Sequence, residues 1–159
     1  QALESARSFL ESLGFPAMKE SYYMISDNLC MINFHSICHT KSGQPALCYP
    51  DLVKVTVELE EGGAIELDAT GYLMNFRSRS PAGPALSKEE ASASLSPYLR
   101  AESASLAIIP TPGLDEVLCW EFLCTASDGQ ELLCYVNAET GGEEQLYLLK
   151  KDEHGVLTA

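Results

Sequence analysis

The sequence predicts an α+β fold of two tandem repeats, each with a helix packed on a small antiparallel β-sheet. Two patterns support this prediction: a helical segment opens each half of the chain, and short strands separated by polar turns follow it. Strands that follow one another directly form hairpins and not βαβ units, which favours the α+β class. We expect repeat 1 to occupy residues 1–80 and repeat 2 to occupy residues 81–159.

The first half is predicted to hold one amphipathic helix and two hairpins. Apolar residues recur at spacings of three and four before Gly14 and Pro16, which end the helix. One hairpin is expected within residues 22–37 and the other within residues 53–69. The second hairpin gives the clearer signal, because apolar and polar residues alternate along Val53–Leu59 and a glycine pair then turns the chain.

The second half follows the same plan after an irregular segment with two prolines at residues 77–86, the best linker candidate in the chain. A Ser-x-x-Glu capping box precedes the next apolar positions, so a helix is expected to begin at about Lys88. Pro97 is expected to end or kink this helix. Strands with a turn at residues 127–129 are expected from residue 106 to residue 149.

A short motif occurs once in each half and indicates a duplication. Gly62 with the following Asp68-Ala69-Thr70-Gly71 corresponds to Gly129 with the following Asn137-Ala138-Glu139-Thr140-Gly141, which has one extra residue. In both copies a strand ends in a short polar residue and the chain then turns at a glycine. The spacing indicates a tandem repeat of about 70 to 80 residues.

Acidic residues dominate the sequence. Ten Lys and Arg residues against 23 Asp and Glu residues give a net charge of −13. This charge opposes binding to nucleic-acid phosphates or to an anionic membrane surface, so neither is expected as a partner. The second half holds 4 basic and 13 acidic residues, against 6 and 10 in the first half. A charged partner of residues 81–159 is therefore expected to be basic.

Six cysteines are present, and most lie in apolar strand-like runs where small buried side chains are expected. One disulfide is conceivable from strand register. Cys124 and Cys134 face each other if a three-residue turn centres on Gly129, and a two-residue turn moves them out of register.

No catalytic residue, metal site or cofactor is predicted. Cys30, His35, Cys38 and His39 are zinc-ligand types, but they lack the usual paired spacing and a strand directs them to opposite faces. The adjacent pair Cys38 and His39 is divided in the same way, which opposes a cysteine nucleophile. Acidic clusters and glycine pairs fit solvated strand faces and turns. The protein is therefore not expected to be an enzyme.

Binding to another protein is better supported than catalysis. We expect a partner to contact Tyr49, Asp51 and Tyr72, which lie near strand ends, and Arg77 and Arg79, which lie in the linker of an otherwise acidic chain. Packing in the core is the alternative role for the tyrosines, and solvation is the alternative for the arginines.

The duplicated Asp/Asn-Ala-x-Thr-Gly motif, with its glycine turn and preceding helix, resembles the PepSY domain, so both repeats are expected to be PepSY-like. A larger set of stretches in one order resembles the C-terminal region of the YpeB family of spore germination proteins. These stretches are Tyr49–Val55, Gly71–Asn75, Ile109–Pro112, Glu116–Phe122, Tyr135–Gly141, Glu143–Gln145 and Gly155–Thr158. The chain departs from the family at Phe76, where members often have a histidine.

The resemblance implies a non-catalytic spore protein. YpeB-like proteins have a membrane-anchoring segment ahead of their PepSY domains and support the stability and localisation of SleB, a cortex-lytic peptidoglycan hydrolase. This implies a chain that binds, stabilises or localises a SleB-like enzyme at or outside the inner spore membrane, without membrane contact of its own. PepSY domains also occur in propeptides of secreted metallopeptidases. A peptidase-inhibitor or propeptide-like module is therefore the alternative.

Overall fold

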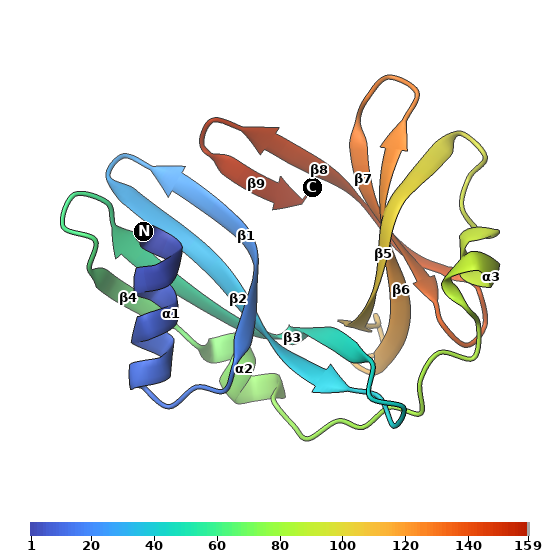
Figure 1. The fold of residues 1–159 in the computed structure, drawn as a ribbon, viewed down its shortest axis with the longest axis horizontal. Coiled ribbons are helices and arrows are strands. Elements are labelled where there is room, and N and C mark those ends of the chain that lie inside the picture. Colours follow the sequence, from blue (N-terminus) through green and yellow to red (C-terminus); the bar gives the residue numbers. More distant parts are fainter. Residues whose placement is uncertain (159) are drawn as a thin grey trace. The chain divides into compact units, whose positions relative to one another are not determined.

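The computed structural model describes residues 1–158 and contains nine strands and three helices within them (Figure 1). The helices are α1 (Ala2–Ser12), α2 (Thr70–Asn75) and α3 (Lys88–Ser92). The strands are β1 (Met18–Ser26), β2 (Leu29–His39), β3 (Pro45–Glu58), β4 (Ala64–Asp68), β5 (Leu99–Pro110), β6 (Glu116–Ala126), β7 (Glu131–Asn137), β8 (Glu143–Asp152) and β9 (Gly155–Thr158).

The predicted α+β class is wrong, because the chain is mostly β. Strands hold 53% of it, and the helix expected from Lys88 ends after five residues, at Ser92. Two stretches without a clear strand pattern are extended: β3 begins at Pro45, and β5 begins at Leu99 in a run of polar residues. Pairing of Leu99 with Ala126 on β6 supplies the hydrogen bonds of that run, so tertiary pairing prevails over weak local preference.

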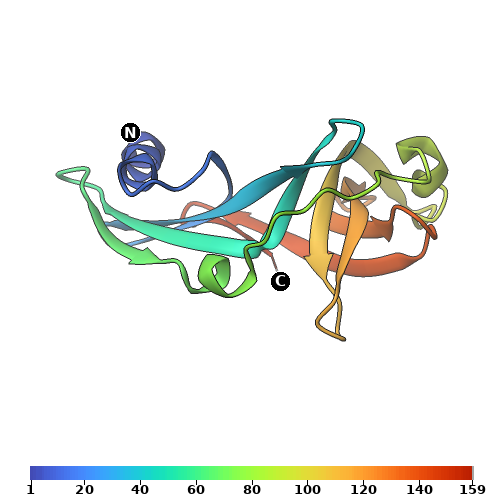
Figure 2. The ribbon, with the colours of Figure 1, turned by 90° about the horizontal axis from the view of Figure 1, so that it is seen from below.

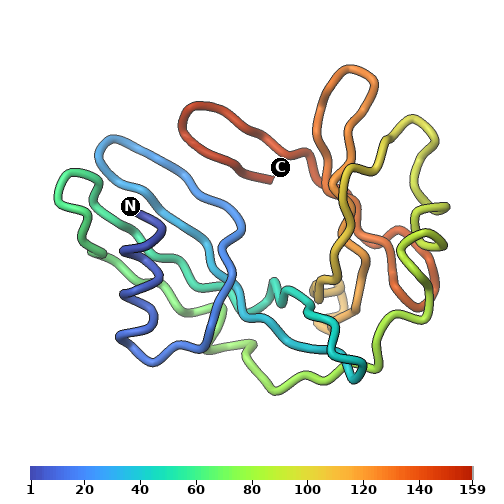
Figure 3. The backbone as a smooth tube through the Cα atoms, viewed as in Figure 1, coloured from blue at the N-terminus to red at the C-terminus, as the bar shows by residue number. Residues whose placement is uncertain are grey.

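The chain forms two compact units, and Figure 3 follows its path through them. Unit 1 consists of residues 1–37, 49–77 and 151–157. Unit 2 consists of residues 38–48 and 78–150, together with residue 158. The chain passes from one unit to the other within β2, β3, β8 and β9, and also between residues 77 and 78. The predicted division into repeats at residues 80 and 81 stays a prediction, because the units are defined by contacts and not by repeated sequence.

Unit 1 has the strand order β4–β3–β2–β1–β9, and α1 lies on one face of this sheet (Figure 2). Alternate residues of β3, from Val53 to Val57, are fully buried and pack against Ala6 and Leu10 of α1. The predicted helix and both predicted hairpins of this half are confirmed as elements. Asp27 turns the first hairpin with a φ of 52°, which aspartate tolerates well.

Unit 2 has the strand order β8–β7–β6–β5–β3, in which the start of β3 runs parallel to β5. Trp120 and Phe122 of β6 belong to its core, and the Trp120 indole N–H donates to the Leu86 carbonyl at 2.9 Å. The predicted capping box of α3 is confirmed: the Ser87 hydroxyl accepts from the Glu90 N–H, and the Glu90 carboxylate accepts from the Ser87 N–H.

The segment predicted as a linker is irregular in structure but is tied to unit 2. The Lys41 N–H donates to the Pro81 carbonyl at 2.9 Å. The N–H groups of Ala85 and Leu86 both donate to the carbonyl of Ala138. Residues 78–86 therefore follow a fixed path along unit 2.

The register of β6 and β7 does not place Cys124 opposite Cys134, as the disulfide considered from the sequence requires. The turn centres on Asp128, since the Ala126 N–H donates to the Gln130 carbonyl at 2.8 Å. Cys124 therefore pairs with Leu132, and Cys134 pairs with Phe122. Both thiols are free and fully buried.

Gly155 provides a test of the β1–β9 pairing in unit 1. Its φ is 151°, and a Cβ at this position would overlap the Tyr23 carbonyl oxygen and lie 3.0 Å from the Met24 Cα. We expect Gly155→Ala to lower the free energy of unfolding by about 2 kcal/mol or more, because backbone atoms would have to move apart. Urea titration of both proteins measures this difference.

Gly63→Ala is the matched control, since no atom lies within 4 Å of the point where its Cβ would be. We expect it to change the free energy of unfolding by less than about 0.5 kcal/mol. Equal stability of the two variants would contradict the pairing of β9 with β1.

Candidate protein-docking site

The motif Asp68-Ala69-Thr70-Gly71 ends β4 and starts α2. The Asp68 carboxylate accepts a hydrogen bond from the Thr70 N–H at 3.0 Å, and this bond lowers the pKa of Asp68. Gly71 then lies flush against β3: a Cβ there would be 2.9 Å from the Leu52 carbonyl oxygen. Only glycine allows this approach without a shift of the backbone.

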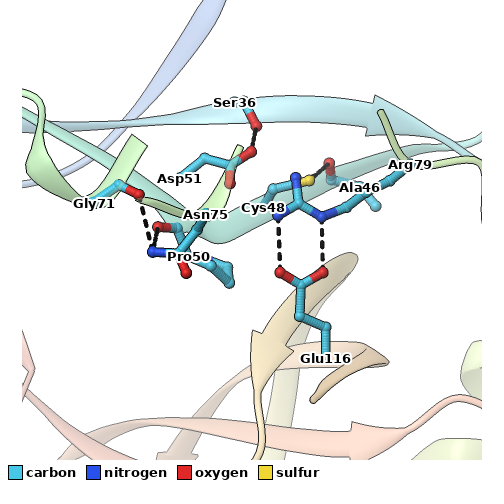
Figure 4. Close-up of polar contacts among 9 residues, drawn as sticks. All are labelled: Ser36, Ala46, Cys48, Pro50, Asp51, Gly71, Asn75, Arg79 and Glu116. Atoms are coloured by element: carbon cyan, nitrogen blue, oxygen red, sulfur yellow. Dashed lines mark hydrogen bonds and ion pairs between the residues drawn. The ribbon is translucent and has the colours of Figure 1, made fainter. Parts of the chain in front are cut away.

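The other end of α2 is fixed to the same strand by Asn75. Its side-chain amide donates to the Pro50 carbonyl at 3.1 Å and to the Gly71 carbonyl at 2.9 Å (Figure 4). Proline has a carbonyl but no N–H, so Pro50 offers the strand an acceptor without a donor. Two contacts therefore fix this short helix to β3, one at each end.

Aromatic rings pack one side of α2 against the rest of unit 1. Tyr72 stacks on Phe76, with ring centroids 4.6 Å apart and an interplanar angle of 18°. Phe15, which follows α1, meets the Tyr72 ring edge-on at 5.2 Å. Burial, with a smaller contribution from the nearby Asp51 carboxylate, raises the pKa of Tyr72. Tyr72 therefore packs against the core and not outward.

Two apolar side chains of α2 lie mostly in solvent, and that of its C-cap residue is half exposed. Leu73 is 78% exposed, Met74 is 79% exposed and Phe76 is 50% exposed. We call these three residues the α2 ridge. Large apolar side chains gathered on a fixed element are typical of a surface that binds another protein.

A buried polar network lies on β2 and β3 of the same unit. The Ser36 hydroxyl donates to the Asp51 carboxylate, and Asp51 is fully buried. The His35 ring meets the Tyr49 ring edge-on at 4.9 Å, and its Nδ1 lies 3.2 Å from the Tyr49 carbonyl oxygen. Because a carbonyl only accepts, Nδ1 carries the proton.

The same histidine is also hydrogen-bonded to a serine, a pair of side chains that can act in catalysis. With Nδ1 protonated, Nε2 accepts a hydrogen bond from the Ser21 hydroxyl at 2.7 Å. Burial lowers the pKa of His35 to about 4, against the opposing effects of the Tyr49 carbonyl and Asp51. The imidazole is therefore neutral and only a weak base at neutral pH, which favours a structural role for the pair.

The five predicted binding residues have different positions. Tyr49, Asp51 and Tyr72 belong to the β3 and α2 region of unit 1, where Asp51 is buried and the tyrosines are partly buried. Arg77 is exposed at the end of the unit 1 segment. Arg79 belongs to unit 2. Contact of any of the five with a partner stays a prediction.

Arg79 makes a bidentate ion pair inside unit 2. Its Nε donates to one Glu116 carboxylate oxygen and its terminal nitrogen to the other, both at 2.8 Å (Figure 4). The Arg79 side chain is only 6% exposed and that of Glu116 is 14% exposed. This geometry is among the strongest that charged side chains form, and it fixes the start of the irregular segment to β6.

Sequence reasoning missed Leu73 and Met74, although it noted the stretch that contains them. The available signal was that Tyr72, Leu73, Met74 and Phe76 are nearly consecutive. A short helix on a sheet buries only one side, so some of these side chains had to remain in solvent.

Metal-ligand types are scattered through residues 1–158. No three His, Cys, Asp or Glu side chains in this range are grouped so that they could hold a metal ion. None of the helices described is long and apolar enough to cross a bilayer.

Comparisons with known proteins agree on one family. A family model described as YpeB sporulation, PepSY1 and PepSY2 domains, matches residues 1–82. Sporulation protein YpeB of Halalkalibacterium halodurans is 37% identical over 105 residues, which are 66% of this chain and 23% of that protein. Sporulation protein YpeB of Oceanobacillus iheyensis is 30% identical over 141 residues, which are 89% of this chain and 30% of that protein. The chain thus spans less than a third of these relatives.

A solved structure is also similar. The Bacillus megaterium YpeB C-terminal domain superposes with a TM-score of 0.78 at 33% sequence identity. The match covers 94% of this chain and 64% of the solved chain.

The buried histidine predicts a pH dependence of stability. His35 has a pKa of about 4 in the folded protein and an ordinary value of 6.5 when unfolded, so the unfolded chain binds more protons between these values. We expect stability to fall as the pH is lowered from about 6.5 towards 4, by up to about 3 kcal/mol from this residue. Urea titrations across this range measure it. His35→Gln should remove this part of the slope, and parallel slopes for variant and wild type would contradict the assignment.

The buried ion pair predicts a large effect in unit 2. Arg79→Met leaves the Glu116 carboxylate without its bidentate partner, so we expect a loss of about 3 kcal/mol in the free energy of unfolding. Arg100→Met is the control, because the Arg100–Glu102 pair lies at the surface and should contribute less than about 1 kcal/mol. Chemical denaturation measures both losses. Similar losses in the two variants would show that the Arg79–Glu116 pair contributes no more to the free energy of unfolding than a surface pair does.

Proposed function

The chain belongs to the YpeB family of sporulation proteins, and we propose from this that it acts without catalysis, by binding and stabilising a SleB-like cortex-lytic peptidoglycan hydrolase. The proposal includes a position in the spore, at or outside the inner membrane, where such a hydrolase meets its substrate. Family membership supports the sporulation role. The structure supports binding as the mode of action.

The observation that carries the proposal is the α2 ridge. Leu73 and Met74 are almost fully exposed, yet neither is needed to hold the helix, which is fixed by Gly71, Tyr72 and Asn75. Exposed leucine and methionine gain no burial energy within the chain. A partner that covers them would gain that energy without having to order the helix first.

The negative charge of the chain indicates which surface charge its partner has. The chain has a net charge of −13, so association is fastest with a protein that presents a basic surface, and the attraction is weakened by salt. We therefore expect the hydrolase to present a basic surface to this chain.

The ridge gives the direct test. We expect the double variant Leu73→Ser, Met74→Ser to bind the purified SleB-like hydrolase of the same organism at least about tenfold more weakly than the wild type, because apolar anchors at the centre of an interface carry most of its energy. Isothermal titration calorimetry measures the affinity. The thermal midpoint of the hydrolase, with and without each protein, measures stabilisation.

Ile65→Ser on β4 is the matched control. Ile65 is 60% exposed and belongs to the same unit, but it lies outside the ridge. It should leave binding unchanged. Equal weakening by both variants would exclude the ridge as the contact, and absence of binding by the wild type would exclude the function itself. Retention and inhibition of a metallopeptidase, and not of the hydrolase, would favour a peptidase-inhibitor module.

Catalysis has its own test. Incubation of the chain alone with purified cortex peptidoglycan should release no muropeptides. Release that is abolished by Ser21→Ala or by His35→Gln would overturn the proposal, since it would assign the Ser21–His35 pair as catalytic.

A further inference from the structure

Strand β5 of unit 2 has a neighbouring strand on both sides over only part of its length. It pairs with β6 from Leu99 to Pro110, whereas β3 pairs with it only from Leu106 to Ile108. Within residues 1–158 no other strand lies beside it. The first residue of β3 is Pro45, which has no N–H and cannot extend this pairing as a donor. The first half of β5 therefore has a free edge, whose backbone groups a further strand could bind.

The two ends of this free edge differ. Towards the start of β5, Arg100 and Glu102 carry charges, and a bulge interrupts the pairing with β6. Charged side chains and bulges are the means by which a sheet edge avoids pairing with another copy of itself. Next to β3, residues 103–105 have small side chains and pair regularly with β6. This end of the edge is open to the close approach of another backbone.

A hollow of about 700 Å³ lies at the same end of the edge. Ala104 of β5, Gln44 just before β3, residues 84–90 and Trp120 line it. The hollow thus lies where β3 stops and β5 loses its second neighbour. Its volume is within the range of about 300–1,000 Å³ that is typical of binding sites in proteins.

Hydrogen bonds fix the walls of the hollow. Trp120 is buried, and its indole N–H donates to the Leu86 carbonyl at 2.9 Å. The Leu86 N–H donates in turn to the Ala138 carbonyl at 2.9 Å. Ser87 and Glu90 are joined in the capping box of α3. A ligand therefore meets a site that is already formed, and no binding energy is lost in ordering these residues.

The charged side chains that line the hollow favour a basic ligand. The Lys88 ammonium lies 3.9 Å from the Glu89 carboxylate, and these two charges offset each other. The Glu90 carboxylate accepts a hydrogen bond from the Ser87 N–H, which lowers the pKa of Glu90 and keeps it ionised at neutral pH. One negative charge remains, and the 13 acidic against 4 basic residues of the second half of the chain add to the attraction for cations.

We propose that the hollow binds an extended segment of a partner protein, which adds a strand to β5 at residues 103–105, in the position that β3 leaves open. Backbone hydrogen bonds to the free edge provide affinity. Every second side chain of the segment faces the hollow and is apolar, because Leu86, Ala104 and Trp120 line it. Lysine or arginine flanks these side chains. The site belongs to unit 2 and does not involve the α2 ridge, which belongs to unit 1.

Synthetic peptides test the proposal on the whole chain. Four peptides have the pattern Lys-Φ-Thr-Φ-Thr-Φ-Lys with blocked ends, where Φ is valine, isoleucine, leucine or phenylalanine. At saturation, we expect at least one of them to slow hydrogen exchange of an amide within residues 103–105 by about tenfold or more, because its N–H becomes hydrogen-bonded. NMR spectroscopy measures the exchange.

Three results of this experiment would overturn the proposal. The first is that none of the four peptides binds. The second is that the protected amides lie outside β5. The third is that residues 103–105 are protected without peptide, to a degree that rises with protein concentration, since this would assign the edge to a second copy of the chain.

Methylated peptides distinguish strand addition from other modes of binding. An N-methyl group removes the amide donor and leaves the side chain unchanged. Successive amides of a strand point to opposite edges, so methylation of one alternate set should weaken binding by about tenfold or more, and methylation of the other set should not. Isothermal titration calorimetry measures the affinities. Equal effects of the two sets would exclude pairing with β5.

A variant tests the place of binding. Gln44→Trp puts a large side chain at the hollow and should weaken binding by about tenfold or more. Gln130→Trp is the matched control, because it makes the same change at an exposed glutamine elsewhere in unit 2, and it should bind as the wild type does. Unchanged binding by the Gln44→Trp variant would contradict the assignment of the site. The methylated peptides decide the question even if a variant does not fold.

Discussion

The close approach of Gly71 to the Leu52 backbone is the constraint on which the docking site depends. It brings α2 down onto β3, so that Asn75 reaches the Pro50 carbonyl and Tyr72 reaches the core. With these contacts made on one side, Leu73 and Met74 have no place inside unit 1 and remain in solvent. The exposure of the ridge thus follows from the way in which the helix is held, and it does not depend on a loose or mobile segment.

The two copies of the repeated motif share a local geometry but lead to different structures. Asp68 accepts from the N–H two residues further on, and Asn137 does the same with the N–H of Glu139. After the first copy the chain forms α2, whereas after the second it turns at Gly141 into β8. A duplicated turn can therefore keep its hydrogen bonds while only one copy presents an apolar surface.

Local patterns predicted local elements well. The stop at Gly14, the capping box of α3 and the alternation from Val53 to Val57 each describe contacts between near neighbours, and each is present. The alternation does not extend to Leu59, which lies beyond the end of β3 and is exposed. The fold class failed because it depends on pairing between distant segments: the polar start of β5 is a strand only because Leu99 meets Ala126. The candidate site was predicted in part. Tyr72 was named for its type, but the exposure of Leu73 depends on Gly71 meeting Leu52, which no sequence spacing reveals.

Strands that belong to both units also affect how the chain folds during synthesis. Unit 1 is completed by residues 151–157, and its β1–β9 pairing joins Tyr23 to Val156. Synthesis must therefore reach residue 150 before either unit has all of its strands. Pairing between such distant segments is slow, and the first hairpins keep an unpaired strand edge until β9 has been synthesised. Their protection from aggregation during this time depends on factors outside the native contacts, such as the high negative charge of the chain.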